Sequence, residues 1–472
     1  MFDPVIAPSG TLLGLLQRGR GDGTLHALAA PRAEALAALN HCVLNDPRHD
    51  WQVENRSLYY ARLYLDLHGG LAEIERHLSD PDDHLDTDEN RTGLALSVLG
   101  HLAAYGRHDA LRLLRGYAAT GANWAWALDE LALRDDDAGL RALAGAVLAR
   151  FPATPEGDAE LAVTVRDAFE PRPWRLWADD PRPTVGARVR AAQETGSFDR
   201  WQRQMRPTGP RPDWSVRSVL DWADEGLERG TPLHVPAARC LSAVAGPDDR
   251  DTLVDVARRG SDGARCTALH YLAQISDPAA LDLIETAVGT GSATVTEAAV
   301  SAFERMCGEA AVDRARGWVH RPDALGASAA GVLACRGGAG DDKLVLGALR
   351  ETVRAQGPDA PPLWTLVDGA GRLGIGCAAP VLRHVYRETA SSHLRGRAAR
   401  ALAATDPSFA TGFAVECLWD CEETTREVAA LHAETGDVRV AERLRRLAAD
   451  PAEEAEVQTA VRSRIGPDHP VG

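Results

Sequence analysis

A repeat of about 31 residues is the feature that most constrains how this chain can fold. Successive turn-forming residues in the C-terminal half are 31, 31, 32, 34, 32 and 30 residues apart. An Ala- and Leu-rich segment precedes each turn and an amphipathic segment usually follows it, which predicts a helix, a turn and a second helix in every unit. The turn residues are Gly246, Asp277, Gly308, Gly340, Gly374, Asp406 and Gly436.

The turn residues fit this interpretation physically. Glycine ends a helix readily in the left-handed conformation, and Asp before Pro can cap the helix that follows. The first half shows the same organisation less regularly, with turns at Gly106 and Asp136, which are 30 residues apart. Because one short helix pair cannot bury its apolar face alone, the pairs must stack. We therefore expect an all-α fold, an α-α superhelical solenoid of about 20–26 helices.

Several second helices open with a pattern of Asp, Val, Arg and Ala. The clearest is "DWSVRSVLDWA", with Asp213, Val216 and Arg217, and looser forms are "DPRPTVGARVRAA" and "HLRGRAARALA". In these features the chain resembles the HEAT-repeat family, including the short HEAT-like units of phycobilisome lyases. The resemblance implies that such Asp and Arg residues form a structural ladder between repeats and that they are not catalytic.

The repeats and the composition together divide the chain into four parts. We expect N-terminal HEAT-like repeats over 1–170, a Pro-, Trp- and Arg-rich junction or set of degenerate repeats over 171–233, and C-terminal repeats over 234–450. A terminal helix and a flexible tail are expected over 451–472. Ten arginines, five acids and seven prolines occur between residues 171 and 217, and prolines at this density interrupt helices.

Charge and targeting signals narrow the classes of function. The 472-residue chain has a formal net charge of −16, which makes nucleic-acid binding unlikely because phosphate backbones are also negative. The first residues lack the pattern of a signal peptide and no apolar run is long enough to span a membrane, so we expect a cytoplasmic protein. Eight cysteines are too few for a disulfide scaffold and predict reduced, mostly buried thiols.

No motif indicates catalysis. The letters "GAGRLG", starting at Gly369, match a dinucleotide fingerprint but fall on a repeat turn, without the strand that the motif needs. Cys417 and Cys421 are one helical turn apart without further ligands in register, which predicts buried thiols and no zinc. We therefore expect no catalytic residue, no metal and no cofactor, and the sequence leaves the oligomeric state open.

Aromatic and charged side chains grouped along the chain are the candidates for contact with a partner. Packing alone also explains such aromatic stripes, so both roles stay open. Trp and Arg are the residue types most enriched at binding hot spots, and a basic segment in an acidic chain suits an acidic partner. The candidates are Trp51, Arg56, Tyr60, Trp124, Trp126, Asp129, Trp201, Arg203, Arg206, Arg211 and Trp214.

These features favour a non-enzymatic scaffold or adaptor that binds a partner protein of unknown identity through the concave surface of a solenoid. An enzymatic alternative is a HEAT-like alkylpurine DNA glycosylase, in which Trp124, Trp126 and Asp129 would surround a damaged nucleotide. A second alternative, suggested by the repeat resemblance alone, is a tetrapyrrole lyase of the phycobilisome type. The acidic net charge argues against the glycosylase, and no chromophore-handling motif supports the lyase.

Overall fold

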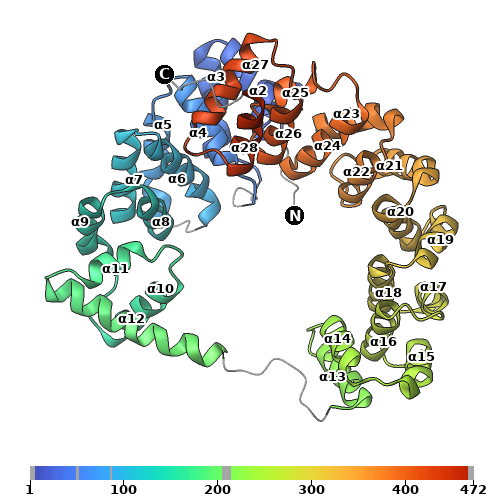
Figure 1. Cartoon of the computed structure of the whole chain (residues 1–472). Coiled ribbons are helices and arrows are strands. Elements are labelled where there is room, and N and C mark those ends of the chain that lie inside the picture. The colour runs from blue at the N-terminus through green and yellow to red at the C-terminus, as the bar shows by residue number, and fades with distance from the viewer. Residues whose placement is uncertain (1–5, 49–52, 85–87, 205–213, 466–472) are drawn as a thin grey trace. The chain divides into compact units, whose positions relative to one another are not determined.

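The computed structural model describes residues 6–48, 53–84, 88–204 and 214–465, with the side chains of 196–204 left out. Within these ranges the chain is all-α, as predicted, with 28 α-helices, four short 3-10 helices and no strand (Figure 1). The helices outnumber the expected 20–26 because the chain adds short ones, such as α1 and α25, to the repeating pairs.

Contacts divide the chain into two compact units. Unit 1 contains residues 1–206, 387–399 and 408–472, and unit 2 contains residues 207–386 and 400–407. The repeat pattern did not indicate that the last helices group with the first ones. The division near residue 206 lies inside the segment expected to be a junction, while the boundaries predicted at 170, 233 and 450 stay predictions.

Unit 1 is built from the first twelve helices and the last four. They are α1 (Leu12–Gln17), α2 (Gly21–Ala29), α3 (Arg32–Leu44), α4 (Arg56–Asp66), α5 (Ala72–Leu78), α6 (Glu89–Ala104), α7 (His108–Thr120), α8 (Trp124–Arg134), α9 (Asp137–Leu148), α10 (Pro155–Asp167), α11 (Arg172–Ala178), α12 (Pro183–Gln204), α25 (Phe413–Cys417), α26 (Glu423–His432), α27 (Val438–Ala449) and α28 (Ala455–Ile465).

Unit 2 is built from the intervening helices, and the boundary between the units passes through the last two of them. They are α13 (Val216–Glu228), α14 (His234–Val244), α15 (Arg250–Arg259), α16 (Asp262–Gln274), α17 (Ala280–Thr290), α18 (Ala293–Arg305), α19 (Glu309–Trp318), α20 (Ala324–Arg336), α21 (Asp342–Gln356), α22 (Leu363–Arg372), α23 (Ala379–Glu388) and α24 (Ser392–Thr405).

The helices stack in rows, as a helix-pair repeat requires. In unit 1, α4 contacts α6 and α6 contacts α8, while α7 contacts α9 in a second row. In unit 2, the row α16, α18, α20 and α22 lies against α15, α17, α19 and α21. Each helix therefore buries one side against its own pair and another against the next pair.

Predicted turn residues lie at helix ends. Gly106 and Gly374 have positive φ angles of 83° and 63°, the left-handed conformation that suits glycine at the end of a helix. Asp136 caps α9, because its carboxylate accepts a hydrogen bond of 2.7 Å from the backbone N–H of Gly139. The repeat turns were therefore located correctly from the sequence.

Two of the three glycines of "GAGRLG" serve helix packing, and the third is Gly374 of the turn described above. Gly369 lies in α22, and a Cβ added there would be 2.7 Å from the Cα of Ala334 on α20. A Cβ on Gly371 would be 3.0 Å from the Cα of Ala401 on α24. These positions lie inside a helix of an all-α stack, so the backbone arrangement of a dinucleotide fingerprint is not formed here.

The first part of the Arg- and Trp-rich segment is well packed. Trp177 is fully buried and donates a hydrogen bond of 2.8 Å from Nε1 to the carbonyl oxygen of Leu140, and Trp174 packs edge-to-face against it. The prolines start helices here, since Pro173 lies in the first turn of α11 and Pro183 begins α12. The segment therefore contributes to the core of unit 1.

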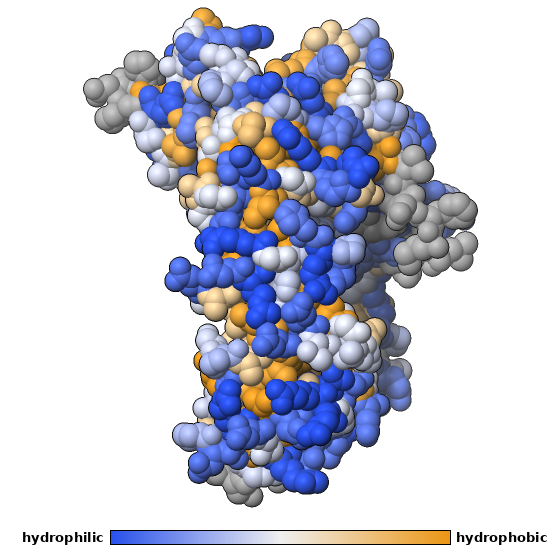
Figure 2. Space-filling view, turned by 90° about the vertical axis from the view of Figure 1, so that its right-hand side faces the viewer, coloured by the Kyte–Doolittle hydropathy of each residue, from blue (hydrophilic) through white to orange (hydrophobic). Residues whose placement is uncertain are grey.

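One side of the molecule shows mainly hydrophilic residues, with hydrophobic residues exposed in scattered areas (Figure 2). None of the helices in the described ranges is both long and apolar enough to cross a lipid bilayer.

Candidate functional site

The first and last helices of the chain pack against each other in unit 1, and we call their contact the end junction. Figure 1 shows the N-terminal helices in blue beside the C-terminal helices in red. The backbone N–H of Cys421 donates a hydrogen bond of 2.9 Å to the carbonyl oxygen of Gly19. A Cβ at Gly21 would lie 1.8 Å from the carbonyl oxygen of Glu416, so glycine is required for this close approach.

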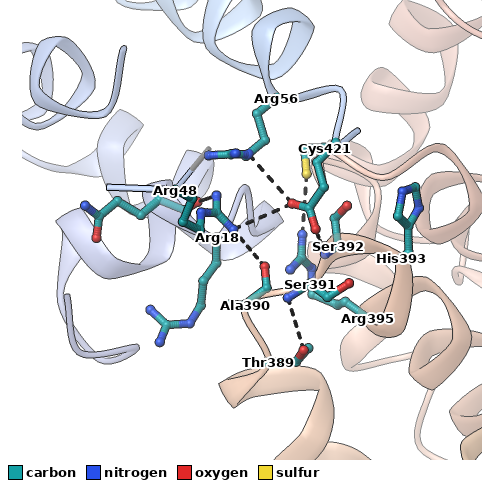
Figure 3. Close-up of polar contacts among 12 residues, drawn as sticks. Arg18, Arg48, Arg56, Thr389, Ala390, Ser391, Ser392, His393, Arg395 and Cys421 are labelled. Carbon is teal, nitrogen blue, oxygen red and sulfur yellow. Dashed lines mark hydrogen bonds and ion pairs between the residues drawn. The ribbon is translucent and has the colours of Figure 1, made fainter. Parts of the chain in front are cut away.

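A cluster of charged side chains links the two ends (Figure 3). Arg48, which follows α3, donates a hydrogen bond of 2.8 Å to the carbonyl oxygen of Ala390. Glu54, just before α4, accepts a hydrogen bond of 2.6 Å from the backbone N–H of Ser392. Arg48 and Arg56 lie 3.6 Å and 3.7 Å from the Glu54 carboxylate, and Arg56 is fully buried. These short-range bonds hold the segment before α24 against the N-terminal helices.

Two buried ion pairs support the C-terminal side of the junction. Arg395 of α24 contacts Asp420 through two hydrogen bonds of 2.8 and 3.0 Å, and neither side chain has exposed surface. Arg426 of α26 forms a similar pair with Glu453 at 2.6 Å. Buried pairs of this kind are stable only when their remaining polar atoms are also bonded, so they fix the geometry of the surrounding helices.

A third set of polar contacts joins α4 to the segment between α27 and α28. Arg62 lies 2.8 Å from Asp450 and 3.0 Å from Glu453. The hydroxyl of Tyr105 donates to Asp450 at 2.8 Å. The guanidinium of Arg62 therefore shares two carboxylates from the other end of the chain.

The thiol at this junction is poorly suited to act as a nucleophile. Burial raises the pKa of Cys421 well above its ordinary value, and the neighbouring Asp420 carboxylate raises it further. Cys417 is also fully buried. Both cysteines are buried thiols, as predicted, and nowhere in the described ranges do three or more His, Cys, Asp or Glu side chains converge as metal ligands would.

Ser392, His393 and Glu422 are the residue types of a catalytic triad, but their hydrogen bonds connect them in a different order. The hydroxyl of Ser392 donates a hydrogen bond of 2.9 Å to Glu422, and His393 Nδ1 lies 3.2 Å from the same carboxylate oxygen. A triad needs the imidazole between the hydroxyl and the carboxylate, whereas here the carboxylate lies between the other two groups. This arrangement holds Ser392 in place by a hydrogen bond to Glu422 and does not put the imidazole in the position of its base.

A second surface of interest lies on α8. Trp126, Asp129 and Leu133 are spaced so that they share the side of α8 opposite its buried residues, Ala127, Leu128, Leu131 and Ala132. The indole N–H of Trp126 donates to the hydroxyl of Ser97 on α6 at 3.1 Å. Leu133 is 59% exposed.

The loop after α10 completes this surface. The backbone N–H of Glu170 donates to the Asp129 carboxylate at 3.2 Å, which brings Phe169 beside α8. Phe169 is 81% exposed. Burial raises the pKa of Asp129 to about 6, and the nearby Glu170 carboxylate contributes to that rise. We call Trp126, Asp129, Leu133 and Phe169 the α8 patch.

Other predicted contact residues have different surroundings. Arg56 and Tyr60 have no exposed surface, and the Tyr60 hydroxyl donates to the carbonyl oxygen of Leu16 at 3.0 Å. Contact between these two side chains and a partner would require the end junction to open. Half-buried Trp124 packs edge-to-face on Phe151, and half-buried Trp214 packs against Trp222 in unit 2.

The remaining predicted residues cannot be placed at the level of side chains. Trp201 and Arg203 belong to the last turn of α12, whose side chains are not described. Trp51, Arg206 and Arg211 lie outside the described residues. Their predicted role in partner contact therefore stays a prediction.

Sequence reasoning identified neither the end junction nor Phe169. A signal for the junction was present in the sequence of α4, RSLYYARLYLD, in which seven of eleven residues are apolar or aromatic, and eight of the eleven are buried in the structure. Consecutive apolar and aromatic residues, such as Leu58 to Ala61, point to more than one side of a helix, so such a helix needs cover on several sides. Phe169 carries no comparable signal, because its exposure depends on the path of the loop.

No protein-family model matches this chain, and a search of curated proteins gave no match.

Proposed function

We propose that the chain is a non-enzymatic, HEAT-like repeat protein that binds a partner protein through the α8 patch. The observation that carries this proposal is the exposure of two large apolar side chains, Phe169 (81%) and Leu133 (59%), on segments that the hydrogen bond between Glu170 and Asp129 joins. Large apolar side chains exposed in this way cost free energy in water, and neighbouring ones are typical of surfaces that become covered on binding. The stacked helix pairs support the HEAT-like assignment, because such rows present extended side-chain surfaces to partners.

The chemistry of the patch suggests what the partner presents. Trp126 and Phe169 provide aromatic surface, and Leu133 provides aliphatic surface. Asp129 is a half-buried carboxylate held by one backbone hydrogen bond, so a basic or N–H group of the partner would pair with it. A partner segment that carries an apolar side chain next to a basic one fits both features. The free state of all eight cysteines supports a cytoplasmic location.

The test compares two surface variants of the full-length protein. Leu133→Ser with Phe169→Ser removes the apolar part of the patch, and Ile275→Ser removes an exposed apolar residue of unit 2, 48% exposed, as the control. Affinity capture from native lysate, followed by mass spectrometry, measures the bound partner. We expect the wild type and the control to retain one stoichiometric protein and the double variant to lose it.

The double variant is expected to fold normally, because both substitutions are at exposed positions. Retention of the same partner at the same stoichiometry by the double variant would contradict the proposal. Capture of DNA fragments instead of a protein, lost on Asp129→Asn, would favour the glycosylase alternative.

A further inference from the structure

Two acidic side chains from opposite ends of the chain meet at the end junction, where α2 contacts α25. Gly21 lets α2 begin directly against the carbonyl oxygen of Glu416, as described above. Asp22 follows in the first turn of α2. The Nη2 atom of Arg20 lies 2.5 Å from the Asp22 carboxylate and 3.8 Å from the Glu416 carboxylate. One guanidinium therefore serves two carboxylates.

These carboxylates are shielded from water but incompletely bonded. The side chains of Asp22 and Glu416 are 29% and 24% exposed, and that of Arg20 is 5% exposed. One oxygen of each carboxylate, Oδ1 of Asp22 and Oε1 of Glu416, is buried and accepts no hydrogen bond from the described residues. Within the same ranges, Arg20 is the one cation at ion-pair distance from either group. Burial without full pairing favours the protonated form of a carboxyl group.

Other charged groups near Glu416 are engaged elsewhere. The guanidinium carbon of Arg387, on α23, lies 5.0 Å from the centre of the Phe413 ring. Arg395, on α24, donates two hydrogen bonds to Asp420, which follows α25. These groups act on Glu416 only from a distance. On α26, which also packs against α25, the guanidinium of Arg426 pairs with Glu453.

The balance of these charges favours a proton on the pair. Burial and the Asp22 carboxylate raise the pKa of Glu416 from its ordinary value of 4.5 to about 7, against the attraction of Arg20 and Arg387. Burial also raises the pKa of Asp22. Both shifts agree with the geometry, in which two negative charges would share a single buried positive charge.

We propose that Asp22 and Glu416 act as a pH-sensitive latch of the end junction, closed while one of the two carboxylates is protonated and loosened when both are ionised. Opening the junction returns both groups to water, where they lose the proton at a lower pH. The ratio of open to closed junction should therefore rise by up to about tenfold per pH unit between about pH 4.5 and 7, and then level off. This device is separate from the α8 patch.

Two histidines in unit 1 also respond to pH but differently. The hydrogen bond to Glu422 raises the pKa of His393 to about 9, so His393 weakens the junction mainly above pH 6.5. Burial lowers the pKa of His101 to about 4, so protonation of His101 weakens the packing as the pH falls. Comparison of the wild type with Glu416→Gln at each pH separates the contribution of Glu416 from these two.

The thiol of Cys421 reports opening of the junction in the full-length protein. Cys421 is buried, and a Cβ added at Gly19 would lie 2.4 Å from its sulfur, so the N-terminal turn covers it. Exposed Cys335 is the reference, because the ratio of the two labelling rates removes the pH dependence of the thiolate. With methyl methanethiosulfonate and mass spectrometry of peptides, we expect this ratio to rise by at least about tenfold between pH 5 and 7.5 in the wild type.

Three variants give the comparison. Glu416→Gln cannot ionise, so its labelling ratio at Cys421 should stay nearly constant over this pH range. Asp22→Asn leaves Glu416 as the only carboxylate on Arg20 and should show a smaller rise than the wild type. Glu434→Gln changes an exposed residue and should keep the wild-type response.

Three results would overturn the latch. The first is a wild-type ratio that does not change with pH. The second is a rise as large as that of the wild type in Glu416→Gln, or in Asp22→Asn should Glu416→Gln fail to fold. The third is an equal rise at Cys266, which is buried in unit 2, because that result would indicate unfolding of the whole chain.

Discussion

Replacing Arg395 by Met tests how strongly the buried ion pair of α24 stabilises unit 1. In the wild type, the two hydrogen bonds to Asp420 are 2.8 and 3.0 Å long and both side chains are fully buried. Methionine preserves much of the side-chain volume but donates no hydrogen bond. The Asp420 carboxylate would then keep only the bond of 3.0 Å from the backbone N–H of Glu422.

The expected cost follows from this uncompensated charge. Removing one partner of a buried ion pair typically costs about 3–5 kcal/mol, because the other charge stays buried without its partner. An exposed pair provides the matched comparison: Arg354 and Glu351 in unit 2 are 76% and 60% exposed. Arg354→Met should cost no more than about 1 kcal/mol.

Urea unfolding followed by circular dichroism gives the free energies of unfolding. Because two compact units need not unfold together, the transition of unit 1 has to be fitted separately from that of unit 2. The double variant Arg395→Met with Asp420→Leu should recover much of the loss, since it removes both charges. A cost of less than about 1 kcal/mol for Arg395→Met alone would refute the reasoning.

Three further predictions concern individual positions. His270 is buried beside the imidazole of His234, and burial lowers the folded-state pKa of His270 from 6.5 to about 3. Acidification below about pH 6.5 should therefore destabilise unit 2 by up to about 1.4 kcal/mol per pH unit. His270→Phe should flatten this slope in acid-unfolding curves. The hydrogen bond to Glu422 raises the pKa of His393 from 6.5 to about 9. The stability that this protonated imidazole adds should be complete below pH 6.5 and be lost as the pH rises to 9. Because the side chain is 40% exposed, we expect a difference in unfolding free energy of no more than about 1 kcal/mol between the wild type and His393→Gln. Gly369→Ala should cost about 1–3 kcal/mol in thermal unfolding, because the added Cβ meets the backbone of α20. In Gly347→Ala the added Cβ, inside α21, meets nothing within 4 Å, so this variant should be more stable by about 0.5–1 kcal/mol. Equal effects of the two substitutions would contradict the packing argument.

The sequence predicted the fold through local rules. Turn residues such as Gly106 and Asp136 mark helix ends because their effect depends only on neighbouring backbone atoms. The alternation of apolar and polar segments between turns then determines the helix pairs. Features of this kind recur in every unit and are visible without knowing which helices meet.

The end junction and most of the α8 patch depend on contacts between distant segments. Glu54 and Ser392 are 338 residues apart, and no periodic signal connects them. The spacing of Trp126 and Asp129 on one helix was visible in the sequence. The addition of Phe169 depends on the hydrogen bond between Glu170 and Asp129, which only the three-dimensional structure reveals.

The central structural claim is that both ends of the chain form one compact unit, and hydrogen exchange followed by mass spectrometry tests it most directly. Arg48→Met changes a residue on the N-terminal side of the end junction and removes its hydrogen bond of 2.8 Å to the carbonyl oxygen of Ala390. If the ends form one unit, amide protection should fall together in α1, α4 and the first turns of α24, while α16 to α20 stay as in the wild type. Loss of protection confined to the N-terminal helices, with α24 unchanged, would contradict the claim.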